Sequence, residues 1–410
     1  MKYFLMLYTA LGCLSCFGQS RNIDFFIQQA KQNNPALKGY QNQLLSNKID
    51  SQLLRAGPKP QVNFINSASY APIIHGYGYD EALSNIANVT SLIQANRNFI
   101  GKNNLLAQYR TITLQNRSLQ DTIRLSEQDL VRVITEQYIT AYGDLLITSF
   151  NQEVYDLMKK EEEVLKKLTQ ASVYKQTDYL NFYVTLQQQE LMLLQGQLQY
   201  NSDYLTLNYL AGIADTSIEQ LQEPFLTDTL AAEFYNSIFY QPFVTDSLRL
   251  VNEKILIDYS YKPKLGAYTD AGLTSSLQHT PYKNFGFSAG MSLVIPIYDG
   301  RQKQLKYNKI ALQEKTRLTN KDFFVSQYQQ QIAIWQQQLS ATDLLVKKIR
   351  QQISYAYTLV IANNKLLETG DISMKDYILG ISNYLAAKNL LTQHNISRLR
   401  IINQLNYWKH

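Results

Sequence analysis

The residue types that most often catalyse reactions or bind metal ions are scarce in this chain of 410 residues. Zinc, haem and thiol chemistry require histidine, cysteine or carboxylate side chains grouped at short spacings. The four histidines lie far apart, with no acidic or thiol cluster around them: His75, His279, His394 and His410. No arrangement of nucleophile, base and orienting group is visible either. We therefore expect a protein that is not an enzyme and has no catalytic residue, no metal site and no cofactor.

The charged residues do not form a nucleic-acid-binding stripe. Lys and Arg number 39 against 33 Asp and Glu, which gives a net charge of +6. Basic and acidic residues alternate in short runs such as residues 159–163, which is typical of a solvated helix face. We expect no nucleic-acid partner.

The N-terminus has the pattern of an export signal. A lysine at position 2 precedes an apolar run that ends near Phe17, and this run is too short to span a bilayer comfortably. We expect residues 1–19 to be a signal peptide whose removal takes Cys13 and Cys16 with it; the alternative is a lipoprotein signal with one of these cysteines acylated. No other segment approaches the roughly 18 consecutive apolar residues of a membrane helix, so membrane entry would require a β-barrel.

Two long stretches without proline, residues 73–223 and 297–410, predict very long helices because proline interrupts helix interiors. Apolar residues recur there in steps of three, four or seven, as on one face of a helix. We expect helices over about 105–170, 178–210, 305–368 and 374–408. Short breaks near Ala171 and Gly370 join them in pairs, so each pair must form an antiparallel coiled-coil hairpin.

A strict alternation over residues 285–298 predicts a strand with one apolar face. The apolar positions are Phe285, Phe287, Ala289, Met291, Leu293, Ile295 and Ile297. Residues 264–274 read as its hairpin partner, and a weaker pair covers 61–70 and 89–100. The length suits a tilted membrane strand whose apolar face contacts lipid; the alternative is a half-buried strand in a soluble sandwich. The alternation places Arg97 on the lipid face; either it lies near the membrane interface or the strand register inferred there is wrong.

An internal duplication explains why helices and strands occur twice. Asp178-Tyr179-Leu180 returns 198 residues later as Asp376-Tyr377-Ile378, and Leu207-Asn208-Tyr209 returns at the same offset. We expect a first repeat over 20–215, a linker over 216–238 and a second repeat over 239–410. Each repeat contains a helix, a strand pair and a long helical hairpin. Four strands cannot close a barrel, so the chain must form an obligate oligomer.

Three motifs carry a resemblance to a known family. They are the helix opening Asn33-Asn34-Pro35-Ala36-Leu37, Pro60 before the first strand, and the run from Gly290 to Arg301 that ends in a Gly-rich turn. The chain resembles the outer-membrane factor (TolC-like) family of efflux and secretion tunnels over almost its whole mature length.

The resemblance implies a mainly α-helical fold with β-strands in the membrane. Each protomer would have duplicated long α-helical hairpins and four β-strands. Three protomers would share a 12-stranded β-barrel in the outer membrane and an α-helical tunnel in the periplasm. The implied function is the channel-tunnel of a tripartite efflux or type I secretion system, with a periplasmic adaptor and an inner-membrane pump of RND or ABC type as partners. The alternative is a periplasmic coiled-coil adaptor (membrane fusion) protein.

The resemblance also indicates where functional residues would lie. The hairpin turns would form the periplasmic constriction, with Gly370 in one turn and Asp178 and Asp376 just after the turns. Asp376 matches a position where the family can carry an acidic ring, which would attract cations. This chain departs from the family at Leu379, where a second acid is expected, and at Ile372, where an arginine is expected. The alternative role of both aspartates is helix capping.

Overall fold

The computed structural model describes residues 21–78, 87–228, 234–276 and 281–409. The expected signal peptide, with Cys13 and Cys16, lies outside these residues. In chain order the elements are α1 (Ile23–Asn33), α2 (Pro35–Ala56), β1 (Gln61–Tyr70), β2 (Ala87–Phe99), α3 (Lys102–Gln170), α4 (Gln176–Leu210), η1 (Phe234–Asn236), α5 (Gln241–Ser260), β3 (Lys264–Ser275), η2 (Pro281–Lys283), β4 (Phe285–Val294), α6 (Gln302–Thr369) and α7 (Met374–Trp408).

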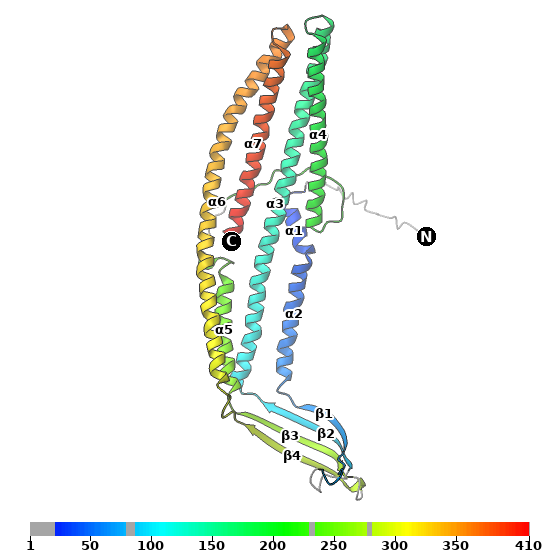
Figure 1. Cartoon of the computed structure of the whole chain (residues 1–410), viewed down its shortest axis with the longest axis vertical. Helices are drawn as coiled ribbons and strands as arrows, with labels where there is room; N and C mark the ends of the chain where they lie inside the picture. Colours follow the sequence, from blue (N-terminus) through cyan, green and yellow to red (C-terminus); the bar gives the residue numbers. More distant parts are fainter. Residues whose placement is uncertain (1–20, 79–86, 229–233, 277–280, 410) are drawn as a thin grey trace, which may run out of the picture. The chain divides into compact units, whose positions relative to one another are not determined.

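The predicted long helices are confirmed. The helices α3 and α6 contain 69 and 68 residues, which corresponds to about 100 Å at 1.5 Å per residue. The helices α4 and α7 contain 35 residues each and begin 198 residues apart. The order of helix, two strands, long helix and helix thus occurs twice (Figure 1). The exact limits of the two repeats and of the linker stay a prediction.

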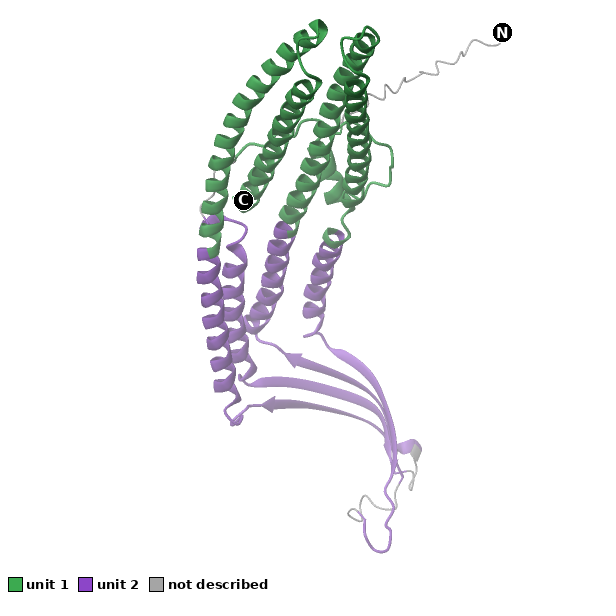
Figure 2. Cartoon of the chain, turned by 45° about the horizontal axis from the view of Figure 1, so that its top comes forward, with its two compact units in different colours: residues 1–37, 126–232, 327–410 green, residues 38–125, 233–326 purple. Residues whose placement is uncertain are grey.

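The helix pairs are antiparallel hairpins, as predicted. Hydrogen bonds join α3 to α4 at positions that step away from the turn equally on both helices: Glu162 with Tyr179, Asn151 with Gln189, and Gln137 with Asp203. In the second hairpin, Asn363 contacts Asp376 near the turn, and Tyr328 contacts Trp408 at the far end. Figures 1 and 2 show both pairs side by side.

The chain folds into two compact units, coloured in Figure 2. Unit 1 contains residues 1–37, 126–232 and 327–410, and unit 2 contains residues 38–125 and 233–326. Each unit draws on both halves of the chain, because the long helices α3 and α6 contribute to both. The repeats are therefore not separate structural domains.

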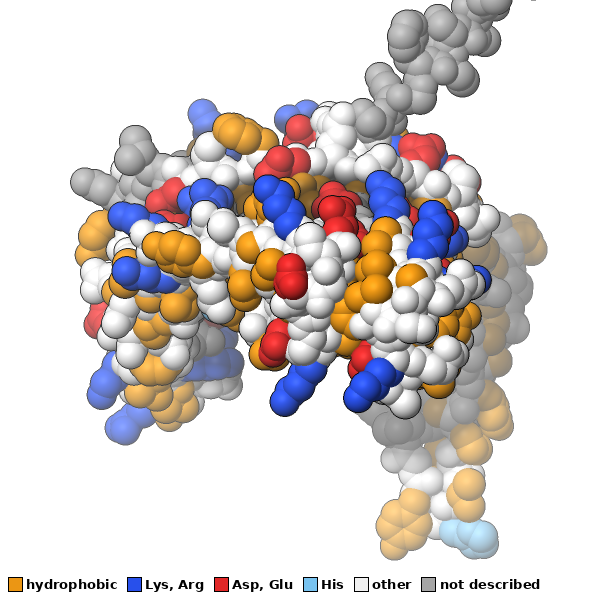
Figure 3. All heavy atoms as spheres, turned by 90° about the horizontal axis from the view of Figure 1, so that it is seen from above, with side chains coloured by type: hydrophobic (Ala, Val, Ile, Leu, Met, Phe, Trp, Pro, Cys, Tyr) orange, Lys and Arg blue, Asp and Glu red, His pale blue; other side chains and the backbone are white. Residues whose placement is uncertain are grey.

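Two clusters of buried side chains form the core of unit 1. One lies near the hairpin turns and joins all four long helices, with Leu165, Phe182, Leu367 and Tyr377 almost fully buried. The other packs α1 against α3 and α4: Phe26, Ile134, Tyr138, Tyr204 and Leu207. Contacts across the hairpins, rather than helix propensity alone, therefore hold the long helices in place. On the face shown in Figure 3, Lys and Arg side chains are interspersed with Asp and Glu among the described residues.

In unit 2 the four strands form one antiparallel sheet in the order β1-β2-β3-β4. The predicted strands are confirmed with small shifts of their ends, except in β4. There, the prediction that the strand continues to Tyr298 is wrong, because β4 ends at Val294. Pro296 has no backbone N–H to donate to a neighbour, and it restricts the residue before it. Ile295 and Ile297 consequently lie beyond the strand.

Candidate functional site

The two hairpin turns share one backbone design. After each long helix a residue adopts a positive φ, which is 63° at Ser172 and 78° at Gly370, positions 198 residues apart. The N–H groups of Val173 and Asp371 then bond back to the carbonyls of Leu168 and Leu366, each at 2.9 Å. This is the Schellman arrangement that ends helices. It confirms Gly370 as a turn residue, while its place at a pore constriction stays a prediction.

The turns also touch each other. A β-carbon added to Gly370 would lie only 2.7 Å from Cγ1 of Val173 in the other hairpin. The hydroxyl of Tyr174 donates a hydrogen bond of 2.9 Å to the carbonyl of Ile372. Tyr174 is buried and belongs to the core cluster near the turns. The two hairpins of one chain are thus joined at their turns by packing and by one oriented hydrogen bond.

Asp178 and Asp376 lie in the first turns of α4 and α7 and take part in helix capping. The backbone N–H of Lys175 donates to Asp178 at 3.2 Å. The hydroxyl of Ser373 donates to Asp376 at 2.6 Å and accepts from its backbone N–H at 3.2 Å. Asp178 therefore accepts a backbone amide, as the capping role expects, whereas at Asp376 the capping side chain is Ser373 and the carboxylate supports its hydroxyl. The side chain of Asp376 is exposed, which leaves it accessible for the pore role that stays a prediction.

Other acidic groups near the turns were not singled out from the sequence. Burial and the carboxylates of Asp178 and Asp371 raise the pKa of the Tyr174 hydroxyl. Burial and the neighbouring Glu368 raise the pKa of Glu161. Glu161 and Glu368 lie on α3 and α6, so this proximity depends on how the two hairpins pack and could not be read from spacing along the chain. The turn region thus contains further carboxyl groups besides the two aspartates: Glu161, Glu368 and Asp371.

The sheet has two chemically different faces. Because directly paired residues in antiparallel strands lie on the same face, the register defines rows across all four strands. One row contains Phe64, Ile93, Ala271 and Phe287, and the next row on the opposite face contains Asn63, Gln94, Asp270 and Ser288. The predicted alternation holds in these rows, whereas the neighbouring rows place Asn66 and Ser91 on the apolar face and Ile65 and Leu92 on the opposite face.

The apolar face is exposed within a single chain. The side chains of Phe285, Phe287, Met291 and Leu293 are 62 to 87% exposed, and they share the apolar face with Phe64 and Ile93. Ile295 and Ile297, beyond the strand, are also exposed. Monomeric soluble proteins rarely expose an apolar surface of this extent, which marks a contact surface. That this surface contacts lipid stays a prediction.

Arg97 lies on the apolar face, as the alternation predicts, in the row of Ala267 and Met291. Its Nε donates to the carbonyl of Pro58 at 3.2 Å, and its guanidinium lies 5.2 Å from the ring centroid of Phe99. Both contacts are at the end of the sheet nearest the helices. The sequence register was correct there.

A pair of carboxyl groups that was not predicted from the sequence lies between α3 and α4 in unit 1. Burial, followed by the hydrogen bond and charge of Asp203, raises the pKa of Asp144 to about 7, while Arg400 opposes the shift. Burial alone would raise the pKa of Asp203. Hydrogen bonds from Asp144, Gln199 and Gln137 outweigh the effect of burial, so the pKa of Asp203 is lowered. Oδ2 of Asp144 is buried and lacks a donor among the described residues. A protonated Asp144 that donates to Asp203 satisfies both groups.

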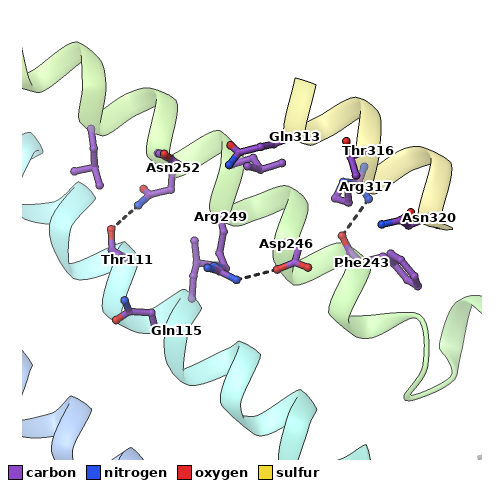
Figure 4. A pocket seen from close by; sticks show the side chains of 14 residues that line it. Thr111, Gln115, Phe243, Asp246, Arg249, Asn252, Gln313, Thr316, Arg317 and Asn320 are labelled. Carbon is purple, nitrogen blue, oxygen red and sulfur yellow. Dashed lines mark hydrogen bonds and ion pairs between the residues drawn. The ribbon is translucent and has the colours of Figure 1, made fainter. Parts of the chain in front are cut away.

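A polar pocket of about 480 Å³ lies between α3, α5 and α6 in unit 2 (Figure 4). Three of its charged side chains have partners: Arg249 pairs with Asp246 at 2.9 Å, and Arg317 donates to the carbonyl of Phe243 at 3.1 Å. Asn252 donates to Thr111 at 2.9 Å. The contacts of Arg317 and Asn252 join α5 to α6 and to α3.

Among residues 21–78, 87–228, 234–276 and 281–409, no group of three or more His, Cys, Asp or Glu side chains could hold a metal ion. None of the helices in this part of the chain combines the length and apolar character that a bilayer crossing requires.

No protein-family model matches the chain, and no curated protein sequence matches it. Solved structures do match. The outer-membrane protein VceC of Vibrio cholerae is 13% identical, with a TM-score of 0.73 over 94% of this chain and 96% of VceC. The outer-membrane channel CmeC of Campylobacter jejuni is 12% identical, with a TM-score of 0.71 over 94% of this chain and 85% of CmeC. The open-state outer-membrane channel MtrE of Neisseria gonorrhoeae is 11% identical, with a TM-score of 0.73 over 94% and 88%. The chain therefore has the fold of these proteins, which confirms the TolC-like resemblance at the level of fold.

Proposed function

We propose that this chain is the outer-membrane channel-tunnel component of an efflux or type I secretion system. Three copies form one tunnel, and each copy contributes four strands to a 12-stranded barrel and two helical hairpins to the tunnel wall. Substrates pass through passively from an inner-membrane pump, of RND or ABC type, and its periplasmic adaptor. The likeness in fold to outer-membrane channels supports this proposal.

The single observation that carries the proposal is the two-faced sheet with two open edges. Within the described chain, β1 pairs only with β2 and β4 pairs only with β3. In lipid the outer backbone groups of β1 and β4 would lack hydrogen-bond partners, each at a cost of several kcal/mol. Pairing of β4 with β1 of the next copy satisfies them. The apolar face then contacts lipid, and the face with Asn63, Gln94 and Ser288 lines water.

The adaptor alternative fits this sheet less well. An adaptor that stays in the periplasm has no use for an exposed row of Phe64, Ile93 and Phe287 beside an open strand edge, which would promote aggregation in water. The chain also has two hairpins and one shared sheet, whereas the adaptor hypothesis expects one hairpin flanked by small β domains.

Membrane fractionation and single-channel recording test the proposal. We expect the mature protein to require detergent for extraction from the outer-membrane fraction, to run as a trimer after chemical cross-linking, and to give stepwise conductance in a planar phosphatidylcholine bilayer. Release as a soluble periplasmic protein, or extraction without any conductance, would refute the channel.

A further inference from the structure

Five contacts between lysines and tyrosines gather where α5 ends and α6 begins, all within unit 2, and four of them share residues with one another. The ammonium of Lys303 lies 5.6 Å from the ring centroids of both Tyr261 and Tyr307. Lys306 lies 5.5 Å from the centroid of Tyr261, and Lys254 lies 5.4 Å from that of Tyr307. Aromatic faces attract cations at such distances, so the rings hold three ammonium groups together. We call these five residues the lysine–tyrosine cluster.

Two aspartates contact the cluster and offset part of its charge. Asp258 accepts from the hydroxyl of Tyr307 and pairs with Lys303 at 3.0 Å, and these contacts lower its pKa. Asp299 accepts from the backbone N–H of Lys303 at 2.7 Å and thereby caps the start of α6. Lys254 and Lys306 form no ion pair in the described part of the chain. The three lysines and two aspartates together leave one net positive charge, carried by the exposed ammonium groups of Lys254 and Lys306.

The cluster adjoins the apolar face of the sheet. Leu265 and Leu293 pair on that face at the end nearest the helices. Tyr261 precedes Leu265 by four residues, and Ile297, which is 95% exposed, follows Leu293 by four. Exposed apolar side chains, tyrosine rings and exposed ammonium groups thus follow one another over a few residues.

This order matches the layers at the edge of a bilayer. Tyrosine prefers the level of the headgroups, with its ring toward hydrocarbon and its hydroxyl toward water, and lysine extends its ammonium group outward from apolar surface. Ammonium groups at this level attract anionic lipids. An acidic protein surface would explain the lysines but would leave Ile297 and its apolar neighbours in contact with water.

The geometry points to a binding site in the lysine–tyrosine cluster for the phosphodiester headgroup of an anionic glycerophospholipid in the adjacent membrane leaflet. The lysines bind the phosphate, the tyrosine hydroxyls lie at the glycerol level, and the acyl chains lie on the apolar face. This inference rests on the proposed function, because it requires the apolar face to contact lipid. It adds a lipid preference at one end of the sheet.

The test uses the full mature chain in a non-ionic detergent, titrated with fluorescent phosphatidylglycerol and, separately, with fluorescent phosphatidylcholine. We expect tighter association of phosphatidylglycerol. In Lys254→Gln/Lys306→Gln that association should weaken about 25-fold, since each cation near a membrane surface contributes about fivefold. Association of phosphatidylcholine should stay unchanged, and Lys254→Arg/Lys306→Arg should keep the preference.

The matched control is Lys160→Gln/Lys166→Gln, which removes two exposed charges from α3 in the other unit. Equal association of the two lipids with the natural chain, or equal weakening in this control, would overturn the inference. Displacement of phosphatidylglycerol by the same concentration of soluble glycerol phosphate would also overturn it, because the site would then bind a free anion. Conductance in phosphatidylcholine bilayers is measured in parallel. A conducting protein without lipid preference overturns only the headgroup site, and a lipid preference without conductance overturns only the channel.

Discussion

Replacing Gly370 by alanine adds one methyl group at the place where the two hairpin turns meet. Gly370 has a φ of 78°, a region that residues with a β-carbon rarely adopt. The new β-carbon would lie 2.7 Å from Cγ1 of Val173, which is closer than van der Waals contact. The substitution therefore combines backbone strain with an overlap between two hairpins.

The two costs can be separated. The left-handed backbone costs about 1 kcal/mol for a residue with a β-carbon. Val173 is half exposed and can move aside, so the overlap adds about 1 kcal/mol, as for a side chain forced away from its rotamer. We expect Gly370→Ala to destabilise the turn region by about 2 kcal/mol in total. A Val173→Ala background should remove the overlap and reduce the cost to about 1 kcal/mol.

The duplicated turn supplies the matched control. Ser172 has a φ of 63° and already carries the backbone strain. Ser172→Ala should therefore change stability by less than about 0.5 kcal/mol, and Ser172→Gly should stabilise its turn by about 1 kcal/mol.

Native-state hydrogen exchange of the peptides that cover residues 165–179 and 363–377 measures these differences as local opening. Gly370→Ala should raise opening in the second peptide about 30-fold, since 1.4 kcal/mol corresponds to a factor of ten. An equal effect of Gly370→Ala with and without Val173→Ala would refute the proximity of the turns. An equal effect of Ser172→Ala and Gly370→Ala would refute the argument from backbone strain.

Three further predictions follow from the sheet, the carboxyl pair and the capping residues. Phe287→Lys places a charge on the apolar face and should reduce barrel stability in lipid by about 2 to 4 kcal/mol, whereas Ser288→Lys on the opposite face should be tolerated. Urea unfolding in phospholipid vesicles compares the two variants, and equal effects would contradict the assignment of faces. Because the pKa of Asp144 is raised to about 7 from its usual 3.8, this group stabilises the fold fully below pH 4, and its contribution is lost as the pH rises through about 7. Urea unfolding should therefore show lower stability at pH 8 than at pH 5 and a smaller difference in Asp144→Asn; an unchanged difference would contradict a shared proton. Asp376→Ala should reduce cation selectivity or block by divalent ions in planar bilayers, and unchanged conductance properties would leave this residue only its capping role.

The long helices and the strands could be predicted because their signals are local. The distribution of proline and the spacing of apolar residues depend only on the chain itself, and so does the alternation that places Arg97 on the apolar face. The end of β4 at Val294 was missed because the apolar alternation continues through Ile297 after Pro296 has already ended the backbone pairing.

Contacts between helices could not be predicted in this way. Asp144 and Asp203 are brought together by the register of the α3–α4 hairpin, and Glu161 meets Glu368 only because two hairpins pack. The direct contact of Tyr174 with Ile372 has the same origin. A shift of one residue in a helix turns a side chain by about 100°, so these contacts depend on packing that a single sequence does not specify.

The hydrogen bond from Tyr174 to Ile372 breaks the equivalence of the two repeats, because these residues occupy the same position, 198 residues apart. Isoleucine has no hydroxyl. Ile372 in the second hairpin therefore cannot donate the equivalent hydrogen bond to the first hairpin of a neighbouring copy. In a ring of three copies, six hairpins would therefore meet at two unlike kinds of seam. Three seams would lie inside one chain and carry this bond, and three would lie between chains without it. The ring would then have threefold rather than sixfold symmetry. The hairpins of neighbouring chains could separate without breaking any hydrogen bond from Tyr174 to Ile372.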